Sequence, residues 1–212
     1  MEKEDILLKN FSILSKSPTK HGEALKDLIL QMLSINPKVA IKCWEELVKS
    51  NLDELKKDFY KDDYHSYSMD YIIVQTIEYN LFKNDDFRHA IPYFVKSKFL
   101  LDIIFSKLPI SKYTSIHYPI SYCIKNDDLK SADIMLSYVY KNKKFNDYSK
   151  LWREIIKEFE YSDLEHYSGG GTVSDLNYKK PEHIQNFCVS WIQRITDEEE
   201  QAGAMTHAMR LF

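Results

Sequence analysis

The chain has 212 residues, of which 44% are hydrophobic and 29% are charged, and its formal net charge at pH 7 is −3. This composition is ordinary for a globular protein and excludes wholesale disorder, and the length predicts one domain over residues 1–212. Nucleic acid is not expected as a partner, because its binding depends on neutralising phosphates and only four residues are arginines: Arg88, Arg153, Arg194 and Arg210.

The sequence predicts a cytoplasmic protein that makes no membrane contact. Its first residues are acidic and no long apolar stretch follows them, so no signal peptide is expected. The densest apolar window, Phe99 to Phe105, is too short to cross a bilayer. Cys43, Cys123 and Cys188 are odd in number and lie on apolar stripes, which indicates free, buried thiols in a reducing compartment.

Apolar residues recur with helical spacing along much of the chain. The stripes fall, in chain order, within residues 24–33, 40–48, 129–139, 151–159 and 184–195. Each stripe places its apolar side chains on one face of a helix, and no comparable stretch alternates with the period of two that a strand requires. The sequence therefore predicts an all-α fold of about ten amphipathic helices in antiparallel pairs.

Several helix starts and one long loop are also marked. Ser17-Pro18 and Asn36-Pro37 each offer a capping side chain followed by proline at the first helical position, and Thr196 with Glu199 has the spacing of a capping box. Residues 161–180 break the helical pattern and contain Gly169-Gly170-Gly171. We expect a loop there, between a main helical stack (1–160) and a C-terminal helical pair (181–212).

A short sequence echo suggests internal repetition. Lys83-Asn84-Asp85-Asp86-Phe87 recurs as Lys125-Asn126-Asp127-Asp128-Leu129, a spacing of 42 residues. Over about residues 35–160 this pattern resembles the HEAT and armadillo class of helical-repeat proteins, whose repeats are close to forty residues long. The resemblance implies a short solenoid. An Asn-Asp-Asp turn is also favoured at any helix junction, so an irregular helical bundle is the alternative.

No residue pattern points to catalysis, a metal or another cofactor. No two of the seven histidines are three or four residues apart, so no helix face presents two imidazoles to a metal ion. The pairs Asp62-Asp63, Asp85-Asp86 and Asp127-Asp128 are better explained as caps and first-turn acids of helices than as acid–base pairs. We therefore expect no enzyme activity.

Aromatic residues make up 14% of the chain and are concentrated among acids near one expected junction. Tyrosine is favoured at protein interfaces because it offers a large contact area and a polar tip. The predicted partner-binding residues are Tyr60, Asp62, Asp63, Tyr64 and Tyr67. Their acids favour a partner with a basic surface, and one concrete form of this function is an inhibitor or immunity-type protein that occludes a basic enzyme.

Two other functions are compatible with the sequence. A helical enzyme could assemble a discontinuous site from histidines and carboxylates of separate helices. An architectural subunit could homo-oligomerise through the C-terminal helix, whose expected apolar stripe is Ala202, Met205, Met209 and Phe212.

Overall fold

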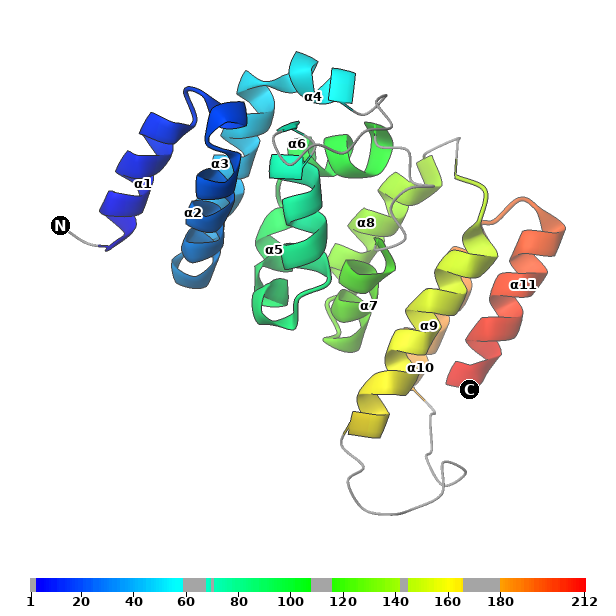
Figure 1. Cartoon of the computed structure of the whole chain (residues 1–212). Helices are drawn as coiled ribbons and strands as arrows, with labels where there is room; N and C mark the ends of the chain where they lie inside the picture. The colour runs from blue at the N-terminus through cyan, green and yellow to red at the C-terminus, as the bar shows by residue number, and fades with distance from the viewer. Residues whose placement is uncertain (1–2, 59–67, 70, 108–115, 142–144, 166–179) are drawn as a thin grey trace. The chain divides into compact units, whose positions relative to one another are not determined.

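All regular structure in the described part of the chain is helical (Figure 1). The computed structural model describes residues 3–58, 68–69, 71–107, 116–141, 145–165 and 180–212. No strand occurs in these ranges, which confirms the all-α prediction, and none of their helices is long and apolar enough to span a bilayer. The chain forms two compact units, residues 1–115 and 116–212. The prediction of a single domain stays a prediction.

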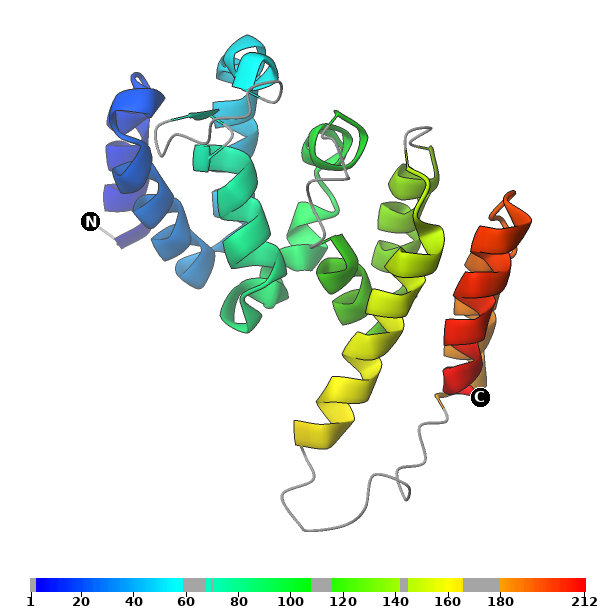
Figure 2. The same ribbon diagram turned by 45° about the vertical axis from the view of Figure 1, so that its right-hand side comes forward.

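The first unit begins with three packed helices. These are α1 (Lys3–Leu14), α2 (Gly22–Ile35) and α3 (Pro37–Ser50), and α2 packs against both of the others (Figures 1 and 2). A 3₁₀ turn, Pro18–Lys20, precedes α2, and α4 (Leu52–Asp58) follows α3. The predicted stripe is buried on α3 (Ala40, Cys43, Trp44, Leu47 and Val48) and, except for the exposed Ala24, on α2 (Leu25, Leu28, Ile29, Met32 and Leu33).

The rest of the first unit contains an unusual amount of π-helix. Tyr71–Gln75 and Ile77–Phe82 are both π-helical, and only Thr76 separates them. We call residues 71–82 the π segment. It is followed by a 3₁₀ helix (Asp85–Ala90), α5 (Ile91–Phe94), α6 (Lys98–Leu101) and a further π-helix (Asp102–Lys107). π-Helices are rare and usually limited to one turn, so this length is a distinctive feature of the unit.

The second unit contains α7 (His117–Lys125), α8 (Leu129–Lys141), α9 (Tyr148–Glu165), α10 (Glu182–Ile192) and α11 (Glu198–Ala208). Helix α7 packs against α8 and α9, and α11 packs against α9 and α10. The stripes of α8, α9 and α10 are buried, with Trp152 and Cys188 at 0% exposure, except that Leu129 and Phe187 are partly exposed. Helix α9 continues through residues 161–165, where the sequence predicts a loop, and the three glycines lie outside the described residues.

Helix α11 docks through a different face from the predicted one. The structure buries Ala204, Ala208 and Leu211, whereas Met209 and Phe212 of the predicted stripe are 60% and 50% exposed. The predicted stripe consists mainly of large apolar side chains, Met205, Met209 and Phe212. In the structure the small residues face inward, and Gly203 lies so close to α9 that an added Cβ would be 2.5 Å from the Ser149 Oγ.

Of the predicted helix starts, the cap at Asn36 is confirmed, whereas those at Ser17 and Thr196 are not. The side chain of Asn36 caps α3 by accepting a hydrogen bond from the Val39 amide at 3.4 Å. Ser17 makes no side-chain cap and begins only a 3₁₀ turn. The predicted cap Thr196 is wrong by one residue, because the carboxylate of Asp197 accepts the hydrogen bond from the Glu200 amide at 2.9 Å.

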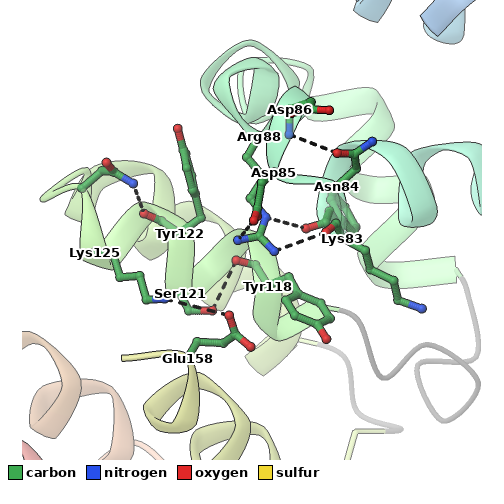
Figure 3. A network of polar contacts seen from close by, with 12 residues as sticks. Lys83, Asn84, Asp85, Asp86, Arg88, Tyr118, Ser121, Tyr122, Lys125 and Glu158 are labelled. Carbon is green, nitrogen blue, oxygen red and sulfur yellow. Dashed lines mark hydrogen bonds and ion pairs between the residues drawn. The ribbon is translucent and has the colours of Figure 1, made fainter. Parts of the chain in front are cut away.

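The two copies of the Asn-Asp-Asp echo are both helix junctions, but they form different turns. In the first copy the Asn84 side chain caps the following 3₁₀ helix by accepting from the Asp86 amide at 3.0 Å (Figure 3). In the second copy Asn126 instead donates to the Tyr122 carbonyl at 2.8 Å, and the capping acceptor is Asp128, two residues after it. Asp127, with φ of 59°, makes the left-handed turn between them.

All three cysteines are free and buried, as predicted. Burial raises the pKa of each thiol from 9.0 to about 12. The folded chain therefore holds these protons in a pH range where the unfolded chain has released them.

We expect the free energy of unfolding to fall as the pH rises from about 9 towards 12, because the folded state then binds more protons than the unfolded state. Once the unfolded thiols have ionised, the fall is about 1.4 kcal/mol per pH unit for each thiol. Urea denaturation over this range measures the slope. Since tyrosines ionise in the same range, Cys188→Ala is the control, and a slope unchanged in that variant would contradict the expectation.

Replacing Gly203 by valine should separate α11 from α9, because the new side chain would overlap Ser149. Overpacking of this kind costs about 1–3 kcal/mol. The matched control is Ala202→Val, at an exposed position of the same helix, where only the small difference in helix propensity applies. Chemical denaturation of both variants measures the difference, and equal losses would show that the close approach is unimportant.

Candidate functional site

The predicted binding residues Tyr60, Asp62, Asp63, Tyr64 and Tyr67 lie outside the described residues, so the acidic aromatic patch stays a prediction. A cavity in the described part of the chain lies in the first unit, beside the π segment. It was not predicted from the sequence. Its residues come from two elements, α2 and the π segment.

The site is a cavity of about 270 Å³, large enough for one amino-acid side chain or a ligand of similar size. Helix α2 contributes Lys26, and the π segment contributes the remaining lining residues: Tyr71, Gln75, Thr76, Tyr79 and Asn80. These five recur in steps of four and five residues, so they share one side of the segment. The buried apolar residues between them, such as Ile72 and Ile77, anchor the opposite side in the core.

Lys26 is the only charged side chain among the described lining residues. Its Nζ lies 2.6 Å from Glu23 Oε2 and 3.3 Å from the Tyr71 hydroxyl. The hydrogen bond to Glu23 raises the pKa of Lys26, and the same bond lowers the pKa of Glu23. Lys26 is therefore a protonated donor at neutral pH and not the neutral amine that nucleophilic catalysis requires.

Hydrogen bonds within the π segment fix the lining groups in place. The Thr76 hydroxyl donates to the Tyr71 carbonyl at 3.2 Å, and the Asn80 amide nitrogen donates to the Thr76 carbonyl at 3.0 Å. The Lys83 amide donates to the Glu78 carbonyl at 3.1 Å, which continues the i to i+5 pattern of a π-helix past its last residue. The Thr76 and Asn80 side chains of the cavity wall are thus held in place by hydrogen bonds.

Arg88 holds the C-terminal end of the π segment. Its Nε donates to the Phe82 carbonyl at 3.1 Å, and its Nη2 donates to the Lys83 carbonyl at 3.3 Å. Its Nη1 forms an ion pair with Asp85 at 2.6 Å (Figure 3). The Arg88 side chain is only 15% exposed, whereas that of Asp85 is 83% exposed. The two carbonyl contacts therefore matter more to the fold than the ion pair does.

Tyr79 is the exposed aromatic residue of the cavity lining, with 55% of its surface accessible. The Lys83 ammonium lies 4.6 Å from its ring centroid. A second exposed tyrosine of this unit, Tyr93, is 39% exposed, and the Lys96 ammonium lies 5.3 Å from its ring centroid. Tyr93 does not line the cavity. The described tyrosines of the site are thus accompanied by lysines, unlike the acidic stretch that the sequence singles out.

Two polar contacts of the second unit join separate helical elements, and a third lies within α7. Lys125 of α7 lies 3.9 Å from Glu158 of α9, and Ser121 donates to the Tyr118 carbonyl one turn earlier (Figure 3). His183 of α10 lies 2.8 Å from Asp127 at the junction of α7 and α8. Among the residues with defined positions, no group of three or more His, Cys, Asp or Glu side chains is placed to hold a metal ion.

Replacing Arg88 by alanine should loosen the end of the π segment, because the Phe82 and Lys83 carbonyls would lose their side-chain donors. We expect a loss of about 1–3 kcal/mol in stability and faster amide exchange over residues 77–83. Hydrogen–deuterium exchange measures this directly. Asp85→Ala is the control, since it removes only the exposed ion pair; equal effects of the two variants would contradict the role of the carbonyl contacts.

Comparison of the chain with models of protein families, with curated proteins and with solved structures finds no match.

Proposed function

We propose that the chain is a protein-binding module, built of antiparallel helix pairs stacked in a HEAT-like manner, and that its first unit binds a partner at the cavity of the π segment. The observation that carries the proposal is the position of Tyr79, an exposed aromatic side chain on the wall of a cavity that also presents the Lys26 ammonium. Aromatic residues beside a small pocket are typical of the few residues that dominate the energy of a protein interface.

The rigidity of the site supports this proposal. Binding costs free energy when flexible side chains and loops become ordered. Tyr79 belongs to a helical segment whose end is held by Arg88, and its neighbour Asn80 is hydrogen-bonded to Thr76. A partner would therefore meet a surface that is already in place.

The charge inside the cavity indicates the partner's character there. Lys26 and Lys83 lie against Tyr71 and Tyr79, and each also forms an ion pair with a glutamate, Glu23 at 2.6 Å and Glu78 at 3.4 Å. Among the described lining residues Lys26 alone is charged, so complementary charge on the partner at the cavity would be acidic. The expectation of a basic partner, and with it the inhibitor or immunity-type form of the function, depends on the acidic stretch at residues 60–67. It stays a prediction for that stretch.

Tyr79→Ala should weaken binding of the partner about thirtyfold, the effect of losing a contact worth about 2 kcal/mol. A photo-crosslinking phenylalanine analogue placed at position 79 and irradiated in the source cells would first identify the partner. The affinity of the purified partner is then measured for both chains.

Tyr93 provides the matched control, since it is also exposed and also has a lysine over its ring, but lies outside the cavity lining. We expect no crosslink from position 93 and an unchanged affinity for Tyr93→Ala. Equal crosslinking from the two positions, or none from position 79, would contradict binding at this cavity.

A further inference from the structure

The cavity of the π segment is equipped to accept a hydrogen-bond acceptor with negative charge. The Lys26 ammonium has three N–H donors. Two acceptors lie within hydrogen-bond distance of it, Glu23 Oε2 and the Tyr71 hydroxyl, which leaves a donor for a group that enters the cavity. The side chains of Gln75, Thr76 and Asn80 add neutral polar groups, and no described acidic residue lines the cavity.

Glu23 contacts Lys26 without lining the cavity itself. The two residues form an i, i+3 ion pair on α2, and the Glu23 side chain is 52% exposed. An exposed ion pair of this kind contributes little to stability, because water solvates the carboxylate almost as well when the pair separates. A carboxylate arriving from another molecule can therefore take the place of Glu23 at the ammonium without unfolding α2.

We infer that the cavity beside the π segment binds a carboxylate side chain of the partner, and that Glu23 competes with this carboxylate for Lys26. The inference rests on the proposed protein-binding function and names the group that the cavity recognises. An aspartate or glutamate of the partner forms a charge-assisted hydrogen bond with Lys26, which the corresponding amide side chain forms only weakly. Tyr79 then covers the aliphatic part of the entering side chain from the wall of the cavity.

Competition between Glu23 and the ligand carboxylate for Lys26 predicts that two variants change the binding affinity in opposite directions. Glu23→Gln removes the competing charge and should tighten binding of a carboxylate ligand about three- to fivefold. Lys26→Met keeps the apolar stem but removes the ammonium, and should abolish binding. A cavity that only recognised shape would not respond to Glu23→Gln in this direction.

The probe is Nα-acetyl-glutamic acid α-amide, which has one carboxylate and imitates a glutamate within a peptide. It is titrated into the full chain while ¹H–¹⁵N spectra record the backbone amides. We expect saturable shifts in residues 71–80, tighter saturation in Glu23→Gln, and no saturation in Lys26→Met. The neutral glutamine counterpart at equal ionic strength is the control and should give no saturable shift.

Equal saturation by the glutamate and glutamine probes would overturn the inference, as would the absence of saturable shifts or an unchanged affinity in Glu23→Gln. These results are distinguishable from failure of the protein-binding proposal. If position 79 crosslinks to a partner but the titrations fail, the partner binds there without a carboxylate contact. If the titrations succeed but no partner crosslinks, the cavity is a carboxylate site and the protein-binding proposal fails.

Discussion

The hydrogen bonds from Arg88 to the carbonyls of Phe82 and Lys83 are the contact on which the described site depends. A helix leaves its last carbonyls without backbone partners, and the π segment ends at Phe82. One guanidinium supplies two such partners in a fixed geometry that lysine could not reproduce. The apolar side of the segment is held by the core, so its remaining side can carry polar groups such as Thr76 and Asn80.

The separation of an apolar side from a side with polar groups explains how a small cavity with a charged lining residue persists in a helical protein. Ile72, Ile73 and Ile77 are fully buried and hold the segment in the core. Thr76 and Asn80 satisfy carbonyls of the same segment, and Lys26 approaches from α2 with its charge already paired. The cavity therefore needs neither a buried unpaired charge nor a strained side chain, and it can keep a donor available for a ligand.

Helices α2, α3, α8, α9 and α10 could be predicted from the sequence, because a stripe of large apolar residues specifies which face is buried. The same signal fails for α11, where small residues at Ala204 and Ala208 are buried and Met209 is exposed. Capping chemistry is locally ambiguous as well: neighbouring Thr196 and Asp197 both offer an oxygen, and only the backbone decides between them. The cavity could not be predicted, since no apolar stripe identified the π segment as helical, and apolar periodicity does not show that Lys26 of α2 lies beside it.

The buried thiols have a practical consequence for studying how the chain opens. Alkylating reagents attack the thiolate, and each cysteine of the folded chain is both covered and protonated at neutral pH. Modification therefore requires local or global unfolding. Cys43 lies in the first unit, and Cys123 and Cys188 lie in the second. The chain thus carries a native reporter in each unit, and the rates of alkylation at the three positions would show whether the units open together or independently.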